Sequence, residues 1–219
     1  MRKLRVKFGA ILMLLAMVVS DGAVLLVIYF LSAALHECGH LVAAKVMKIE
    51  IEEIRFDFSG VRICTDKNIP SYLHELMLSA AGPLINVVSV TLCVCIFSLC
   101  GVSLTDVVAS VISLFDGEYT VWGAVGFFAA SSLLQGGINL LPINTLDGGR
   151  ILFCASALLF GEKCASAVIK ATSFIAAFVL WTVALYLLLR VSSGLGIFVF
   201  AACVFIATAG ENNETAILS

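Results

Sequence analysis

The sequence predicts an all-α polytopic membrane protein with about six transmembrane helices. Of its 219 residues, 61% are hydrophobic and 13% are charged, and the mean hydropathy is +1.10. A soluble domain of this size could not bury that much apolar surface. The apolar residues form long runs rather than the alternating pattern of a β-barrel. The predicted helices cover approximately residues 8–20, 22–46, 75–100, 120–141, 166–189 and 194–209.

The distribution of basic residues predicts that both termini are cytoplasmic. With the N-terminus inside, Arg190 is the one cation on the outer side, and the segment around Asp106, Asp116 and Glu118 forms an external loop without Lys or Arg. The other twelve cations then face the cytoplasm: Arg2, Lys3, Arg5, Lys7, Lys45, Lys48, Arg55, Arg62, Lys67, Arg150, Lys163 and Lys170. We therefore expect residues 1–219 to form one integral-membrane domain in a bacterial cell membrane.

The N-terminal segment, the net charge and the cysteines bear on alternative interpretations of the chain. Residues 1–20 also fit a cleavable signal peptide, with a basic start and a short apolar core, and this alternative stays open. The net charge of −2 gives no reason to expect a nucleic-acid partner. Most of the eight Cys lie within apolar runs, where Cys behaves as a small hydrophobic residue, so no disulfide framework is expected.

Residues 49–65 are predicted to form a membrane-associated β-hairpin between the second and third helices. Apolar and polar residues approximately alternate there, with one slip at Glu52-Glu53, and Ser59-Gly60 provides the turn. The hairpin could hold an extended substrate as an added strand, or it could simply cap the helix bundle. The sequence does not decide between these two roles.

The pentapeptide His36-Glu37-Cys38-Gly39-His40 lies inside the second apolar run. Residues four apart share a helix face, so His36 and His40 can present two imidazoles to one ion, with Glu37 beside them. Two His and a Glu in this spacing are typical of a zinc peptidase, in which the Glu is the general base. Ionisable groups at membrane depth are costly, which makes a chance match less credible than it would be in a soluble helix.

A third ligand is expected from the segment 139–150, NLLPINTLDGGR. Pro142 should end a helix there, and Gly148-Gly149 allows a tight turn. Asp147 at that turn could reach a metal, although a turn-forming Asp before two glycines would explain it equally well if the segment stood alone.

Together, HECGH (36–40), SAAGPLIN (79–86) and NLLPINTLDGGR (139–150) resemble the site-2 protease family (peptidase M50) of intramembrane zinc metalloproteases. The order and the short loops look closest to the bacterial sporulation-stage subgroup that processes a pro-sigma factor. The resemblance covers essentially the whole chain, without the inserted PDZ domain or C-terminal CBS domain of other members. By this resemblance the protein carries out regulated intramembrane proteolysis near the cytoplasmic side.

The resemblance also implies roles for single residues. One Zn²⁺ would be bound by His36, His40 and Asp147, and Glu37 would be the catalytic base. Asn86, Asn139 and Pro142 match positions near the substrate. The motif positions Gly82 and Pro83 could equally serve a helix start or close helix packing.

The implied partners are a transmembrane or membrane-associated protein substrate and the lipid bilayer, with a regulatory membrane protein or a homo-oligomer left open. Two other functions remain as alternatives. A catalytically silent homologue that binds membrane segments should lack the base or a ligand, whereas all four residues are present. A metal-handling membrane protein should carry more than one set of metal ligands within the membrane, whereas the sequence shows a single set.

Overall fold

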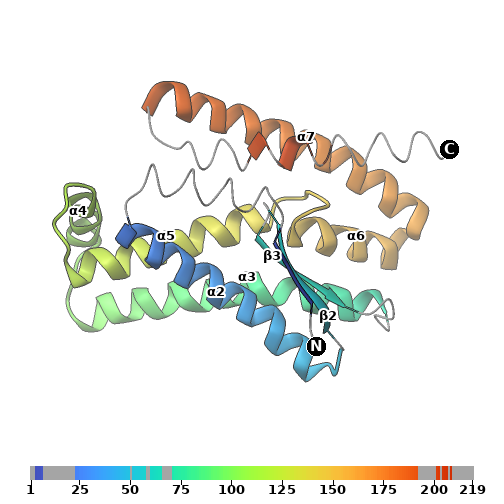
Figure 1. The fold of residues 1–219 in the computed structure, drawn as a ribbon, viewed down its shortest axis with the longest axis horizontal. Coiled ribbons are helices and arrows are strands. Elements are labelled where there is room, and N and C mark those ends of the chain that lie inside the picture. Colours follow the sequence, from blue (N-terminus) through green and yellow to red (C-terminus); the bar gives the residue numbers. More distant parts are fainter. Residues whose placement is uncertain are drawn as a thin grey trace.

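The computed structural model describes residues 3–6, 23–49, 51–57, 60–65, 71–191, 201–202, 204–206 and 208. Helices dominate this part of the chain, and three strands join them (Figure 1). In chain order the elements are β1 (Lys3–Val6), α2 (Ala23–Val46), β2 (Ile51–Asp57), β3 (Gly60–Thr65), α3 (Tyr72–Leu99), α4 (Leu104–Phe115), α5 (Val121–Asn139), α6 (Asp147–Phe160) and α7 (Glu162–Val191).

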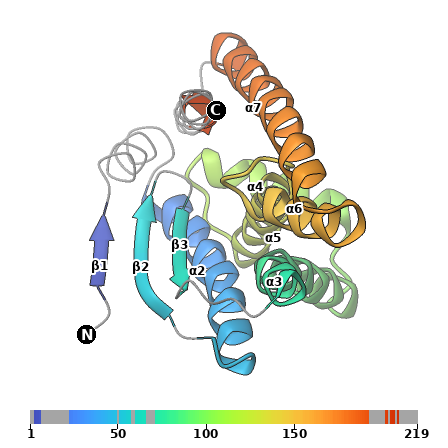
Figure 2. The ribbon, with the colours of Figure 1, turned by 90° about the vertical axis from the view of Figure 1, so that its right-hand side faces the viewer.

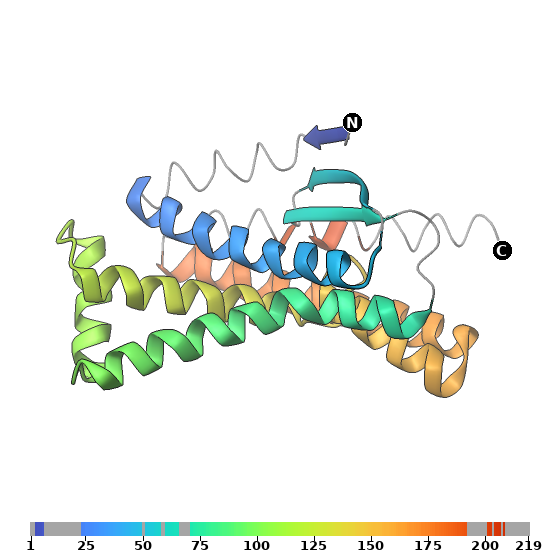
Figure 3. The same ribbon diagram turned by 90° about the horizontal axis from the view of Figure 1, so that it is seen from below.

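Helices α2, α3 and α5 lie side by side and form the centre of the molecule (Figures 1 and 3). Their close approach depends on glycine. A Cβ added to Gly39 on α2 would lie 2.6 Å from the carbonyl oxygen of Ala81 on α3. Small residues let helix backbones approach closely in membranes, where apolar contact with a neighbour gains little over contact with lipid. Gly39 therefore brings the α2 histidines against α3.

Four helices of the described part are long and apolar enough to cross a membrane: Val24–Val46, Tyr72–Leu99, Val121–Asn139 and Glu162–Arg190. They correspond to the predicted second, third, fourth and fifth helices, with ends that differ by up to four residues at the start of α7. The predicted helix 8–20 lies outside the described residues, and most of the predicted helix 194–209 does too.

Two shorter helices were not predicted. The expected external loop contains α4, which begins with a capping box: Ser103 Oγ accepts the backbone N–H of Asp106, and the Asp106 carboxylate accepts the backbone N–H of Ser103. The segment between the predicted fourth and fifth spans contains α6, which has only 14 residues. Neither is long enough to span a bilayer, which takes about 20 residues, so a search for spanning runs passes over both.

The strands form a three-stranded sheet in the order β1-β2-β3, with β3 closest to α2 (Figure 2). Strands β2 and β3 pair antiparallel, and the register shifts between Ile51 and Glu53, near the slip in the sequence pattern. Ser59 of the predicted turn is outside the described residues, whereas Gly60 begins β3. The parallel pairing of β1 with β2 was not predicted.

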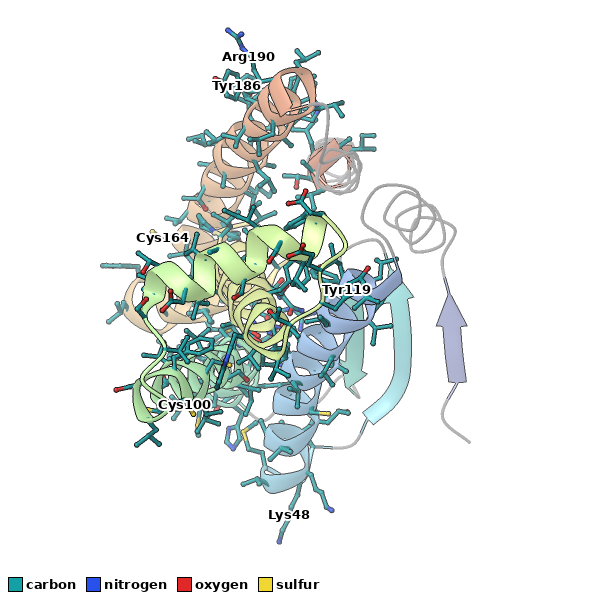
Figure 4. The ribbon with its side chains drawn as sticks, turned by 90° about the vertical axis from the view of Figure 1, so that its left-hand side faces the viewer. Lys48, Cys100, Tyr119, Cys164, Tyr186 and Arg190 are labelled. Carbon is teal, nitrogen blue, oxygen red and sulfur yellow. The ribbon has the colours of Figure 1, made fainter. Side chains whose placement is uncertain are left out.

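The ends of the bundle differ in what they carry. Helix α4 lies at one end of the long axis, whereas α6 and, nearer the middle, the sheet lie toward the other end (Figure 1). Lys48 projects beyond the end of α2, and Arg190 lies far from it at the end of α7 (Figure 4). Cys100, which directly follows α3, and Cys164 of α7 are labelled in the same view, and both are free thiols.

The turn between α5 and α6 is held against α7. Ile143 is fully buried and Leu146 is 3% exposed, and both belong to one apolar cluster with Ala177 of α7. The backbone N–H of Asn144 donates to Ser173 Oγ at 2.8 Å. These contacts fix the start of α6, where Asp147 stands.

Candidate metal centre

Helix α2 presents His36 and His40 on one face, turned inward. The two residues are 1% and 8% exposed, and their ring centroids are 4.9 Å apart. Their spacing of four residues places the rings one above the other along the helix. The predicted pairing of the two imidazoles is therefore present in the fold.

Asp147 reaches the same point from the first turn of α6. Two glycines allow its approach: a Cβ on Gly148 would lie 2.1 Å from the carbonyl oxygen of Leu140, and one on Gly149 would lie 2.1 Å from that of Ile143. The tight turn predicted at Gly148-Gly149 is wrong, because both glycines lie in the first helical turn of α6. They are needed there because the backbone of residues 140–143 packs closely over this helical turn. Burial alone would raise the pKa of the Asp147 carboxyl, yet hydrogen bonds with His36 and His40 lower it to about 2. The side chain is thus a carboxylate at neutral pH.

The ligand atoms of His36, His40 and Asp147 form a compact triangle. His36 Nε2 lies 3.3 Å from His40 Nε2, and Asp147 Oδ2 lies 3.1 Å and 3.3 Å from the two nitrogens. Ligands about 2.0–2.1 Å from a tetrahedral zinc ion are about 3.3–3.4 Å apart. Two imidazoles and a carboxylate at this separation fit zinc with one open position. Among the described residues, this is the group of His, Cys, Asp and Glu side chains able to hold a metal ion.

Gly82 of α3 lies directly over this triangle. A Cβ at Gly82 would be 2.3 Å from His40 Nε2 and 2.6 Å from His36 Nε2. Any larger residue would fill the space that the two nitrogens face. The motif glycine thus has a specific function, which the sequence alone did not separate from ordinary helix packing.

Helix α3 also contacts the outer nitrogen of each imidazole. His40 Nδ1 donates to the backbone carbonyl of Leu78 at 2.8 Å. In a neutral, metal-bound imidazole the proton would therefore reside on Nδ1, and His40 Nε2 would face the ion. His36 Nδ1 lies 3.1 Å from the Asn86 side-chain amide. Both ring orientations are therefore set by α3.

The remaining predicted site residues have different positions. The Asn139 amide nitrogen lies 3.1 Å from His36 Nε2, at the edge of the triangle. Pro142 lies half-buried in the turn after α5. Glu37 is half-buried on α2, next to His36. Cys38 is exposed.

One polar cluster near the site was not predicted. Ser32 Oγ lies 2.9 Å from Ser132 Oγ and donates to Gln135 Oε1 at 3.0 Å. Ser32 is one helical turn before His36, and Gln135 is one turn before Asn139. Polar residues placed four positions before His36 and Asn139 were the sequence pattern that could have indicated this cluster.

Three comparisons relate the chain to known proteins. The model for peptidase family M50 matches residues 23–183. A curated zinc metalloprotease of Methanocaldococcus jannaschii is 32% identical over 130 residues, which cover 59% of this chain and 33% of that protein. The solved structure of the site-2 protease from Methanocaldococcus jannaschii is similar with a TM-score of 0.60 and 25% identity, over 94% of this chain and 88% of that one. The match thus spans about a third of the length of the curated relative.

Proposed function

Because the chain belongs to peptidase family M50, we propose that it is an intramembrane zinc metalloprotease. Its reaction is hydrolysis of a peptide bond in or beside a transmembrane segment of a protein substrate. The observation that carries the proposal is the buried triangle of His36, His40 and Asp147, with separations of 3.1–3.3 Å that suit one tetrahedral zinc ion. The Gly82 position, which keeps the space before the nitrogens open, adds independent support.

In this proposal His36, His40 and Asp147 hold the zinc ion. Bound zinc polarises a carbonyl and lowers the pKa of water from 15.7 to about 7. Glu37, beside His36 on α2, accepts the proton of the attacking water and returns it to the leaving amine. The buried setting strengthens each of these interactions, because little water competes with them.

The substrate must present an extended backbone, because a helix conceals its own peptide bonds. We assign this task to the β-hairpin, which would add the substrate as a strand. The antiparallel pairing of β2 with β3 and the proximity of β3 to α2 support this assignment (Figure 2). Asn139 and Pro142, at the end of α5 and in the turn after it, would contact the substrate near the scissile bond.

We further propose that the protein crosses the cell membrane of a bacterium six times, as one domain over residues 1–219 with cytoplasmic termini. The end that carries Lys48 and α6 would then be cytoplasmic, and the end with α4 and Arg190 external. Cleavage would occur toward the cytoplasmic side and release a cytoplasmic fragment. The sporulation-stage subgroup, whose motif order is most similar, provides the first substrates to test.

The test is co-expression of the full-length protein with single-span membrane substrates that include pro-sigma factors. Wild type and Glu37→Gln are compared for cleavage and, after purification, for zinc content. Glu118→Gln is the matched control, because Glu118 is exposed at the α4 end. We expect Glu37→Gln to keep zinc and lose cleavage, and Glu118→Gln to behave as wild type.

Other outcomes discriminate the remaining functions. Zinc in the wild type without cleavage of any substrate in a broad panel would favour a protein that binds membrane segments. Undiminished cleavage by Glu37→Gln would contradict the assignment of the base. A wild-type protein without zinc would overturn the metal centre itself.

A further inference from the structure

We propose that Asn86 is a positioning residue: its side-chain oxygen accepts a hydrogen bond from His36 Nδ1–H and thereby fixes the imidazole with Nε2 toward the metal. The inference rests on the proposed metal centre and adds to it a specific role for a side chain on α3. Metal-bound imidazoles commonly donate their second nitrogen to an oxygen acceptor, which fixes both tautomer and ring orientation.

The contact lies deep in the bundle. Asn86 is 2% exposed and His36 is 1% exposed, and the amide lies 3.1 Å from His36 Nδ1. A side chain so enclosed is poorly placed to meet a substrate backbone. The expectation that Asn86 contacts substrate therefore has less support than a role through His36.

The direction of the hydrogen bond follows from the proton on His36. Nε2 faces His40 Nε2 and the Asp147 carboxylate at 3.1–3.3 Å, so it is the nitrogen available to a metal. A metal-binding nitrogen carries no proton, and the proton of a neutral imidazole then resides on Nδ1. The partner of Nδ1 must therefore be an acceptor.

Asn86 can supply that acceptor by a half-turn of its amide. In the structure the amide nitrogen faces Nδ1, and Asn86 Oδ1 is buried without a hydrogen-bond partner among the described residues. The two ends of a carboxamide have nearly the same shape, so exchanging them requires no other movement. The exchange pairs the buried oxygen with Nδ1–H.

Neighbouring elements hold both residues in place. A Cβ on Gly136 of α5 would lie 3.2 Å from Asn86 Nδ2 and from Asn86 Cβ, so α5 packs closely on the amide. His40 has the equivalent arrangement, with Leu78 O as the acceptor for its Nδ1–H. Helix α3 thus orients both zinc-binding imidazoles, one with a backbone carbonyl and the other with a side-chain amide.

The experiment measures the zinc affinity of the full-length protein in detergent by competition with a chromophoric chelator. Asn86→Leu removes the acceptor at similar volume, whereas Asn86→Asp keeps an acceptor and removes the donor. The visible absorption of the Co²⁺-substituted protein reports the ligand geometry. Ser132→Ala is the matched control, because Ser132 is another buried polar residue of the bundle and lies on α5.

We expect Asn86→Leu to bind zinc about 10–100-fold more weakly and to alter the Co²⁺ spectrum, with Asn86→Asp within about threefold of wild type. Ser132→Ala should match wild type. Two outcomes would overturn the role of Asn86: equal losses of zinc affinity in the leucine and aspartate variants, or wild-type zinc affinity in Asn86→Leu. In both cases the proposed function stays intact as long as the wild-type protein binds zinc. If Asn86→Leu does not fold, Asn86→Asp alone distinguishes the two possible roles of Asn86. An aspartate can accept a hydrogen bond from His36 Nδ1–H but cannot donate one, so Asn86→Asp would lose zinc if Asn86 acted as a donor. A wild-type protein without zinc would overturn both proposals.

Discussion

Gly82 and His36 meet across the interface between α3 and α2, where a Cβ on Gly82 would lie 2.6 Å from His36 Nε2. The same Cβ would lie 2.3 Å from His40 Nε2. Contacts this short do not occur with real side chains, so the absence of a side chain at position 82 is a condition for the two nitrogens to face a common ion.

Gly82→Ala should therefore weaken zinc binding roughly tenfold or more and reduce cleavage accordingly, since displaced imidazoles cannot keep tetrahedral geometry. Zinc content after purification and chelator competition measure the effect. Gly137→Ala is the matched control, because nothing lies within 4 Å of a Cβ at Gly137 on α5. Full zinc occupancy in Gly82→Ala would show that the nitrogens do not share an ion at this place.

The turn before α6 gives a second prediction. Ile143→Ala should lower the free energy of unfolding by about 2–5 kcal/mol, because Ile143 is fully buried and its truncation leaves a cavity. Cleavage should fall as well, since this turn positions Asp147. Thermal unfolding and cleavage assays check both effects. Leu140→Ala, in the same turn but 50% exposed, should have little effect, and equal effects of the two variants would contradict this role of the turn.

Thiol reactivity gives a third prediction. Burial, together with the neighbouring Glu75 carboxylate, raises the pKa of the Cys154 thiol to about 12. At pH 8 about one molecule in ten thousand then carries the reactive thiolate. In the native protein a maleimide should label the exposed Cys164 and leave Cys154 unmodified until denaturation, as measured by peptide mass spectrometry. Rapid labelling of Cys154 in the native state would contradict its enclosed position on α6.

Metal removal gives a fourth prediction. A strong zinc chelator should abolish cleavage, and added zinc should restore it. Because the ion would bind the folded state alone, zinc at a hundredfold excess over its dissociation constant should stabilise the protein by about 2.7 kcal/mol. Thermal unfolding with and without zinc measures this difference. Cleavage that continues in metal-free protein would contradict the proposed chemistry.

Much of the helical framework could be predicted from hydropathy alone. The predicted helices 22–46 and 75–100 closely match α2 and α3, because an apolar run long enough to cross a membrane has few alternatives to a helix. Helices α4 and α6 fall below the length that such a search detects. The capping box at Ser103 was a usable signal for the start of α4.

The candidate site was predictable in its residues but only partly in its contacts. The spacing of His36 and His40 predicts a shared helix face, whereas the approach of Asp147 needs the packing of its turn on α7. That Asn86 requires a partner inside the membrane follows from its chemistry. That the partner is His36 depends on how α3 lies against α2, which no local pattern encodes.

The most direct test of the metal centre is X-ray absorption at the zinc edge on the purified, zinc-loaded protein. Ligation by His36, His40 and Asp147 predicts a shell of nitrogen and oxygen at about 2.0–2.1 Å, with imidazole scattering and no sulfur. Asp147→Ala should lose the carboxylate contribution or the ion. A sulfur shell at about 2.3 Å would contradict the assignment, because it would place the zinc on cysteine rather than on this triangle.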